Sequence, residues 1–370
     1  MIFNSVIYSK TPIFIQNIIL STRGLIRKLF RESFDKTLLL DTLQQHDYNS
    51  KKLLCFSEFR LSLVLKNTIE NIPFYINIEP KPMGISNYPL ISKLDVIQNS
   101  LSFKSNIKQG IEVQGSTSGS TGTPLSIVQN LESVRREQAF ICRSLAWAGF
   151  EKGDKRAWIR GDLIVPLDQK EAPFWRYSFF EDMLLLSSYH MTAAAMPLYI
   201  KAMSEYGVNI IQAYPSSIVT LAKYLKETNQ YYSGDLKSVL TSSESLSKPD
   251  KALIEERFNC KVFDWYGLFE RVAAIASCES DRYHILTDYS YVELLPVGVV
   301  DGKRRAEIVG SNFNNTLYPL IRYRTGDHVI LSDEVSCPCG RVFPIVDSIE
   351  GRVGDYLIAE DGQKVYILNH

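Results

Sequence analysis

Between residues 196 and 267 the sequence alternates between two hydrophobic spacings, and this alternation constrains the fold more than any other feature. Apolar residues recur at helical spacing in the stretches YIKAMSEYG, PSSIVTLAKYLKET and SKPDKALIEERFN. Short apolar runs flank them, namely VNIIQAY, LKSVLTSS and CKVFDWYG, which predict strands. Strands that alternate with helices build a largely parallel sheet, so we predict an α/β fold with mixed or parallel sheets flanked by helices.

The pattern changes from about residue 283 onward, where the stretches YHILTDYSYVELLP, RRAEIVGS and DHVILSD predict strands joined by turns. Upstream, residues 36 to about 75 and 130–150 have helical spacing. We therefore predict three parts: an N-terminal helical region (1–105) packed on the core, a core (106–352) with a smaller β-rich subdomain, and a hinge that begins a further domain (353–370).

Composition excludes several classes of protein. The 370 residues are 45% hydrophobic, which is ample for a large core, and 41 basic residues balance 41 acidic ones, so no net charge points to nucleic acid. No run of about 18 uncharged apolar residues predicts a membrane-spanning segment. Six cysteines without a recognisable export signal favour a reducing, cytoplasmic compartment over a disulfide scaffold.

The first 30 residues are apolar but are interrupted by Lys10, Arg23, Arg27 and Lys28. Two interpretations remain open. The segment is either a helix that docks on the core or a helix that lies on a membrane surface.

The stretch GSTSGSTGTPLSI (115–127) concentrates glycine and hydroxyl side chains. Such a loop can bind phosphate, because glycines let backbone N–H groups approach closely and hydroxyls donate further hydrogen bonds. It lacks the Lys of a Walker loop and the central Ser of a nucleophile elbow. The alternative is a flexible linker.

TSGSTGTP (117–124) resembles the phosphate loop of the adenylate-forming (acyl/aryl-CoA synthetase-like) enzymes, which join a carboxylate to AMP from ATP. The resemblance implies that this loop binds the phosphates of ATP and that Thr121 is also catalytic. The loop residues are Thr117, Ser118, Gly119, Ser120, Thr121, Gly122 and Thr123.

Four further segments occur in the order of that superfamily. FDWYGLFER (263–271) resembles its Tyr-Gly-x-x-Glu segment, which implies that Tyr266 lies along the adenine, beside Trp265 and Gly267, and that Glu270 holds magnesium. SSESL (242–246) resembles the turn whose backbone lines the adenine, and YRTGD (323–327) resembles the segment whose Asp binds the ribose hydroxyls. EGRVGD (350–355) resembles the element whose Arg contacts the ribose or phosphate. The matching residues are Ser242, Ser243, Glu244, Asp327 and Arg352.

These residue types suit the implied chemistry. A carboxylate such as Asp327 can accept hydrogen bonds from both hydroxyls of a ribose diol. An acidic side chain such as Glu270 supplies the oxygen ligand that Mg²⁺ prefers. Magnesium and an arginine would offset the repulsion between an attacking carboxylate and an anionic phosphate.

Within the superfamily, PLISKLDVIQN, PLIRYRTGDHVIL and CPCGR resemble the phenylacetate–CoA ligase branch and its capsular-polysaccharide-biosynthesis relatives. That branch implies a structural zinc ion held by Cys278, His284, Cys337 and Cys339, because three thiolates and one imidazole complete a tetrahedral site. The alternative is that these residues are unrelated, with a buried Cys278 and a simple turn at CPCG.

The chain also departs from the family pattern. Thr123 stands where a Lys is common, and Phe269 where a Ser or Thr is common. Gly354 stands at the hinge position where an Asp is common. The family continues beyond the hinge with a small domain whose Lys completes adenylate formation, so we expect the chain as given to bind nucleotide but to catalyse poorly.

The predicted function is ATP-dependent activation of a small carboxylic acid to an acyl-adenylate, followed by transfer to CoA or an amine, in a polysaccharide pathway. The alternatives are a catalytically weak nucleotide-binding scaffold of a polysaccharide assembly system and a phosphotransferase. The sequence leaves a homodimer open.

Overall fold

The computed structural model describes residues 6–78, 84–116, 124–351, 356–358 and 364–366. The chain forms two compact units. Unit 1 consists of residues 1–32 and 144–265, and unit 2 of residues 33–143 and 266–370. Helix α7 (Leu131–Trp147) and strand β8 (Lys261–Gly267) each cross from one unit into the other along the chain.

Unit 1 is an α/β layer built on the predicted alternation. Its sheet has the order β8-β7-β6-β3-β5-β4, with parallel pairing throughout except for the antiparallel edge strand β4. The strands are β3 (Arg156–Ile159), β4 (Trp175–Ser178), β5 (Met183–Leu186), β6 (Ile210–Ala213), β7 (Ser238–Ser242) and β8.

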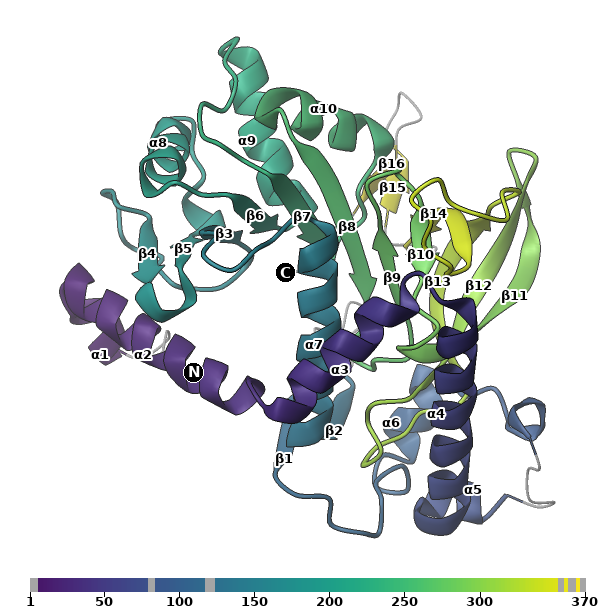
Figure 1. Ribbon diagram of the computed structural model, residues 1–370. Helices are drawn as coiled ribbons and strands as arrows, with labels where there is room; N and C mark the ends of the chain where they lie inside the picture. Colours follow the sequence, from purple (N-terminus) through teal and green to yellow (C-terminus); the bar gives the residue numbers. More distant parts are fainter. Residues whose placement is uncertain (1–5, 79–83, 117–123, 352–355, 359–363, 367–370) are drawn as a thin grey trace. The chain divides into compact units, whose positions relative to one another are not determined.

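The helices of unit 1 cover both faces of this sheet, with α8, α9 and α10 on one side and α2 on the other (Figure 1). They are α1 (Val6–Lys10), α2 (Ile13–Arg31), α8 (Met196–Tyr206), α9 (Pro215–Glu227) and α10 (Lys248–Phe258), with short 3-10 turns η3 (Phe179–Glu181) and η4 (Ser188–His190). Prolines in the first turn and a Ser247 side chain that accepts from the Asp250 N–H explain where α9 and α10 begin.

Unit 2 combines helices with an antiparallel sheet of order β11-β12-β13-β14-β10-β9. Its strands are β9 (Ala274–Ser277), β10 (Tyr283–Ile285), β11 (Ser290–Val300), β12 (Lys303–Asn312), β13 (Tyr323–Leu331) and β14 (Ile345–Glu350). Two separate hairpins are β1 (Glu112–Ser116) with β2 (Ser126–Asn130), and β15 (Tyr356–Ile358) with β16 (Lys364–Tyr366).

The helices of unit 2 precede its sheet in the sequence. They are α3 (Phe34–His46), α4 (Ser50–Asn71), α5 (Pro73–Ile76), η2 (Ile85–Asn87), α6 (Lys93–Gln98) and most of α7. A capping box between Ser92 and Asp95 fixes the beginning of α6. An aromatic-rich core that includes Tyr75, Phe103 and Tyr323 joins these helices to the sheet.

The predicted α/β class and the predicted β-rich C-terminal part are confirmed. The units follow a different division from the predicted parts, because residues 13–31 pack on β4 and η3 of unit 1 whereas α3 and α4 pack in unit 2. The predicted 1–105, 106–352 and 353–370 parts stay a prediction. Strands β1, β4, β5, β9, β14, β15 and β16 were not predicted, since such short runs carry little periodic signal unless clear helical patterns flank them.

Candidate functional site

The glycine- and hydroxyl-rich segment connects two antiparallel strands of unit 2. In this hairpin Gly115 pairs with Ile127 and Ser116 with Ser126. The predicted phosphate-binding residues Thr117–Thr123 lie outside the described residues, but the strand that leads into them is described. A Cβ atom on Gly115 would lie 2.4 Å from Phe269 Cζ, which is closer than real Cβ contacts allow. The stem of the loop therefore lies against the side chain of the residue next to Glu270, and a larger residue at position 115 would displace the Phe269 ring.

Glu270 is buried shortly after β8, and hydrogen bonds from neighbouring strands hold both its carboxylate and its backbone carbonyl. Tyr323 on β13 donates its hydroxyl hydrogen to Glu270 Oε1 at 3.1 Å. The side-chain amide of Asn312 on β12 donates to the Glu270 carbonyl oxygen at 3.3 Å. The following residue, Arg271, adopts a positive φ of 55° that turns the chain sharply. The geometry fixes one carboxylate beside the loop stem.

Asp327 supplies the second carboxylate of this part of unit 2. It follows Gly326, whose φ of 76° is left-handed. The Thr325 hydroxyl accepts a hydrogen bond from the Asp327 backbone N–H at 3.0 Å, so the turn is held internally. The Tyr266 hydroxyl donates to Asp327 Oδ2 at 2.8 Å. The predicted ribose-binding acid and the predicted adenine-contacting tyrosine are thus direct neighbours.

Tyr266 links the two acids electrostatically. Burial, and then the negative charge of Asp327, raise its pKa well above the ordinary value, and Glu270 contributes in the same direction. A phenol beside two carboxylates stays protonated and acts as a hydrogen-bond donor. Unit 2 therefore brings together Tyr266, Glu270 and Asp327, which the sequence separates by up to 61 residues.

Gly267 ends β8 in unit 2, and the other predicted nucleotide-site residues lie in unit 1 or outside the described residues. Ser242 pairs with Trp265 across β7 and β8. The Glu244 carboxylate accepts from the backbone N–H and the hydroxyl of Ser216, at 2.8 and 3.0 Å, and so holds the first turn of α9. Their role at the adenine stays a prediction, as does that of Arg352, which lies outside the described residues.

Ser243 and Arg160 form a contact that sequence reasoning did not predict. Ser243 has a φ of 73°, and its hydroxyl accepts a hydrogen bond from Arg160 at 2.6 Å. The Arg160 guanidinium lies 4.8 Å from the Trp158 ring and 5.0 Å from the Tyr214 ring. Arg160, Tyr214 and Ser243 directly follow the parallel strands β3, β6 and β7, where ligands of open α/β sheets bind.

Cys278, His284, Cys337 and Cys339 converge in unit 2, with all ligand atoms within 4.8 Å of one another. The Cys278 and Cys337 sulfurs are 3.5 Å apart, and Cys339 Sγ lies 3.4 Å from His284 Nε2. Burial, together with the charge of Arg341, lowers the pKa of His284 to about 4. A neutral imidazole and three thiol side chains are a complete tetrahedral donor set for Zn²⁺.

The segment that carries two of these cysteines is anchored to the helices of unit 2. The Val342 N–H donates to the Asp47 carbonyl at 2.9 Å, and the Arg341 guanidinium lies 5.8 Å from the Tyr48 ring. The Phe343 ring packs edge to face on the His284 ring, with 6.4 Å between the ring centroids. The Cys/His cluster therefore lies where the sheet meets the connection between α3 and α4.

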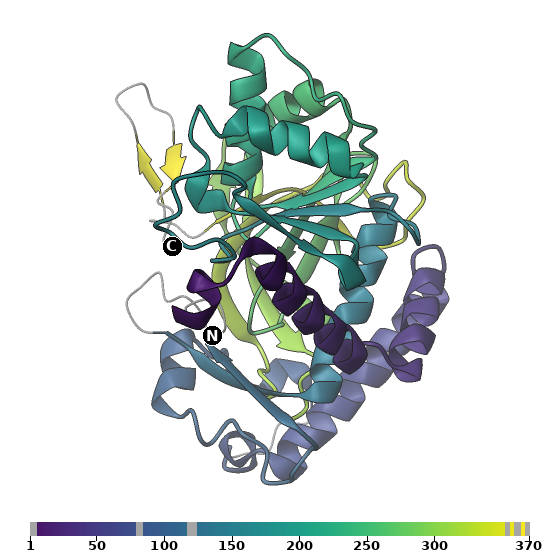
Figure 2. The same ribbon diagram turned by 90° about the vertical axis from the view of Figure 1, so that its left-hand side faces the viewer.

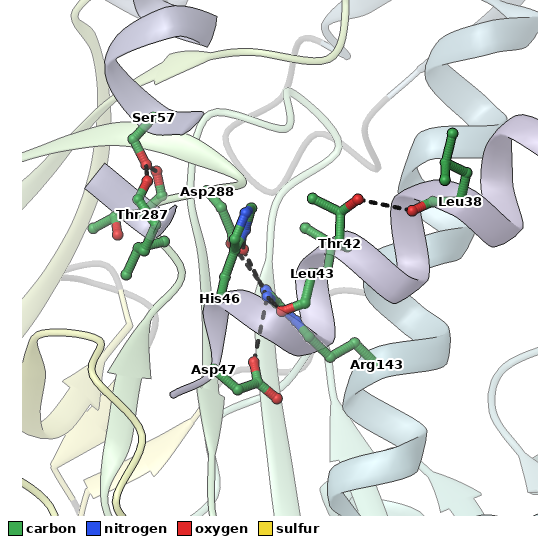
Figure 3. Close-up of polar contacts among 10 residues, drawn as sticks. Leu38, Thr42, Leu43, His46, Asp47, Ser57, Arg143, Thr287 and Asp288 are labelled. Atoms are coloured by element: carbon green, nitrogen blue, oxygen red, sulfur yellow. Dashed lines mark hydrogen bonds and ion pairs between the residues drawn. The ribbon is translucent and has the colours of Figure 1, made fainter. Parts of the chain in front are cut away.

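A buried ion pair beside this cluster was also missed by sequence reasoning (Figure 3). Arg143 on α7 makes two hydrogen bonds to the Asp288 carboxylate, at 2.7 and 2.9 Å. His46 Nδ1 lies 3.0 Å from the same carboxylate, and Asp47 lies 3.5 Å from the guanidinium. Nothing in the local sequence marks these residues, because they come from α3, α7 and the turn after β10.

Two solved ligase structures share the fold of this chain. 2-Hydroxyisobutyryl-CoA ligase in its postadenylation state with R3-HIB-AMP aligns with a TM-score of 0.61 at 17% identity, covering 87% of this chain and 72% of that one. The same ligase with 2-HIB-AMP and CoA in its thioesterification state gives 0.60 at 19% identity, covering 86% and 71%. These alignments show that the chain has the fold of an adenylate-forming ligase.

Within that superfamily the chain resembles two curated proteins. Protein CapK of Staphylococcus aureus is 27% identical over 368 residues, which cover 95% of this chain and 78% of CapK. Phenylacetate-coenzyme A ligase of Pseudomonas putida is 23% identical over 344 residues, which cover 87% and 73%. No protein-family model matches the chain. The resemblance to the superfamily and to a CapK-type relative, inferred from the motifs, is confirmed.

Proposed function

We propose that this protein activates a small carboxylic acid with ATP and transfers the acyl group to CoA. The observation that carries this proposal is the linked set of Tyr266, Glu270 and Asp327 in unit 2, beside the stem of the hydroxyl-rich loop. The similarity to phenylacetate-coenzyme A ligase supports both half-reactions. The alternative acceptor in the second half-reaction is an amine.

Each side chain has a stated role in this proposal. Asp327 accepts hydrogen bonds from the ribose hydroxyls, and the Tyr266 hydroxyl holds its carboxylate in place. Glu270 is the residue that would hold Mg²⁺, since it presents carboxylate oxygens and Tyr323 fixes its orientation. The ion would neutralise charge that develops on the phosphates.

The chemistry balances in two steps. A carboxylate oxygen of the acid attacks the α-phosphorus of ATP, the bond to the β-phosphate oxygen breaks, and acyl-AMP and pyrophosphate form. The thiol of CoA then attacks the acyl carbon and loses its proton, which gives a thioester and AMP. Residues Thr117–Thr123 are the proposed ligands of the phosphates in the first step.

One observation favours the alternative of a catalytically weak nucleotide-binding scaffold. Phe269 stands where the family commonly has a hydroxyl, and its ring lies against Gly115 at the loop stem. A phenyl ring cannot donate a hydrogen bond to a phosphate. The similarity to CapK, with the motif resemblance, supports a place in polysaccharide assembly for either function.

Carboxylate-dependent ATP–pyrophosphate exchange separates these functions. An acid from a broad panel should stimulate exchange, and Asp327→Asn and Glu270→Gln should each reduce it at least about a hundredfold if they act on the transition state. Asp301→Asn, at an exposed turn, is the matched control and should keep full activity. Nucleotide binding by calorimetry with no exchange for any acid would favour the scaffold, and ADP formation would favour a phosphotransferase.

We also propose that the Cys278–His284–Cys337–Cys339 cluster binds a structural zinc ion. The donor set is closed, with four protein ligands and no position left for a substrate. Its support is the convergence of the four ligand atoms and the anchoring of the Cys337–Cys339 segment on α3 and α4. Metal analysis of protein purified without chelator should give about one equivalent of zinc per chain.

A further inference from the structure

Helix α2 is attached to unit 1 by an unusually polar face. Gln16, Leu20, Ser21 and Gly24 are its buried residues. A Cβ atom on Gly24 would lie 2.3 Å from Glu181 Oε2, so the helix lies very close to η3. The Phe179 N–H donates to the Ser21 hydroxyl at 2.9 Å. These contacts fix which side of α2 faces the protein.

The opposite face of α2 is apolar and exposed to solvent. A surface helix normally turns its apolar face toward the core, and α2 does the reverse over most of its length. The exposed side chains recur at helical spacing and form what we call the apolar stripe: Phe14 (64% exposed), Ile18 (55%), Ile26 (49%), Leu29 (67%) and Phe30 (52%). Figure 2 shows α2 in front of the strands of unit 1.

The charged side chains of the segment that carries the apolar stripe all have one sign. The first 31 residues contain five basic side chains and no acidic one, although the whole chain has no net charge. With about 3.6 residues per turn, Lys28 falls beside one edge of the stripe and Arg23 beside the other. The five are Lys10, Arg23, Arg27, Lys28 and Arg31.

We propose that α2 binds the surface of an anionic lipid bilayer, with the apolar stripe at the boundary between headgroups and acyl chains. An apolar face flanked by basic residues is the pattern of an interfacial helix. Basic side chains gain free energy next to anionic headgroups. Among the described residues, no helix is long and apolar enough to cross a membrane, so α2 would lie on the bilayer rather than span it.

The same charges argue against a second copy of the chain as the occupant. Two apolar stripes that paired with each other would bring only basic groups of these segments together, which is repulsive. An anionic lipid surface instead matches both properties of the helix. This inference does not depend on the proposed ligase activity, since unit 1 carries it through α2 alone.

Co-sedimentation with lipid vesicles tests this proposal. The protein should bind vesicles of equimolar phosphatidylcholine and phosphatidylglycerol, and should bind phosphatidylcholine vesicles much more weakly. The double variant Phe14→Ser/Leu29→Ser should lower the partition coefficient at least about tenfold, because it removes two apolar side chains from the interface. Lys28→Gln should lower the partition coefficient about fivefold. Added salt should also lower it.

Matched controls come from the same chain. Leu101→Ser changes a leucine that is 86% exposed in unit 2, and Lys170→Gln changes an exposed lysine outside α2. Neither should alter vesicle binding. Equal binding to both lipid mixtures, or an equal loss in Leu101→Ser, would overturn the proposal. A dimer seen by light scattering that the double variant abolishes, without any lipid binding, would assign the apolar stripe to a second copy instead. Circular dichroism checks that the variants fold.

Discussion

Replacing Arg143 by Met would leave a carboxylate without its strongest partner in the interior of unit 2. The side chains of Arg143 and Asp288 are 1% and 0% exposed, so water cannot take the place of the guanidinium. Removing one member of such a pair costs about 3–5 kcal/mol of unfolding free energy, far more than the pair itself contributes. We expect this loss in Arg143→Met.

The unfolding free energy lost in Arg143→Met should depend on pH, because it depends on the charge of Asp288. Burial alone would raise the pKa of Asp288, but Arg143 and a hydrogen bond from His46 hold it below its ordinary value. The ionised Asp288 carboxylate therefore stabilises the wild type above about pH 4, and this stabilisation is lost as the pH falls through the lowered pKa. Without Arg143, burial dominates and the pKa rises above the unfolded value. The stability difference between wild type and variant should then narrow toward acidic pH.

Hydrogen exchange measured by mass spectrometry is the suitable assay, because all four tryptophans lie in unit 1 and fluorescence would not report on unit 2. Peptides from α3 and from residues 283–290 should lose protection in Arg143→Met. Arg136→Met on the same helix breaks only a partly exposed pair with Glu132 and should cost about 0.5 kcal/mol or less. Adding Asp288→Asn to Arg143→Met should recover stability. A loss no larger than that of Arg136→Met, or no recovery, would refute the reasoning.

Three further predictions concern the candidate site and the cysteine cluster. Cys337→Ser should reduce bound zinc well below one equivalent by metal analysis, whereas Cys55→Ser, at an exposed free cysteine, should not. Tyr323→Phe removes the hydrogen bond to the Glu270 carboxylate and should slow pyrophosphate exchange about tenfold or more, because bonds to charged groups are worth about 1.5–3 kcal/mol; an unchanged rate would separate Tyr323 from the reaction. Gly115→Ala should destabilise the protein by about 0.5–1.5 kcal/mol in thermal unfolding, because the new Cβ forces the partly exposed Phe269 ring out of its rotamer, and Phe269→Ser in the same chain should relieve this loss.

Much of the candidate site could be predicted because its residues lie in short motifs with a fixed order. Tyr266 and Glu270 are four residues apart at the end of one strand, and Asp327 follows a glycine that permits the left-handed turn. The four cysteine and histidine ligands were predicted from the same resemblance and are within 4.8 Å of one another. Their chemical roles stay predictions.

Other contacts could not be predicted, because they join distant segments that carry no local signal. The sequence around Tyr323 indicates only an ordinary strand residue, yet its hydroxyl donates a hydrogen bond to Glu270, which lies 53 residues earlier in the chain. Arg143 lies in an amphipathic helix, and only the packing of α3 and α7 against the turn after β10 places it on Asp288. For residues 1–30 the sequence left two interpretations, and α2 does pack on unit 1, through its small and polar residues.

The sequence by itself determined the α/β class, the alternating helices and strands of residues 196–267, the strands from about residue 283 onward and the superfamily, since periodicity, caps and glycine-rich turns act within a few residues of one another. Only the tertiary structure decided which face of α2 is exposed, which tyrosines hold the two acids, and which charges are buried together. Those properties depend on the direction of side chains across packed elements, and a one-dimensional pattern does not contain that information.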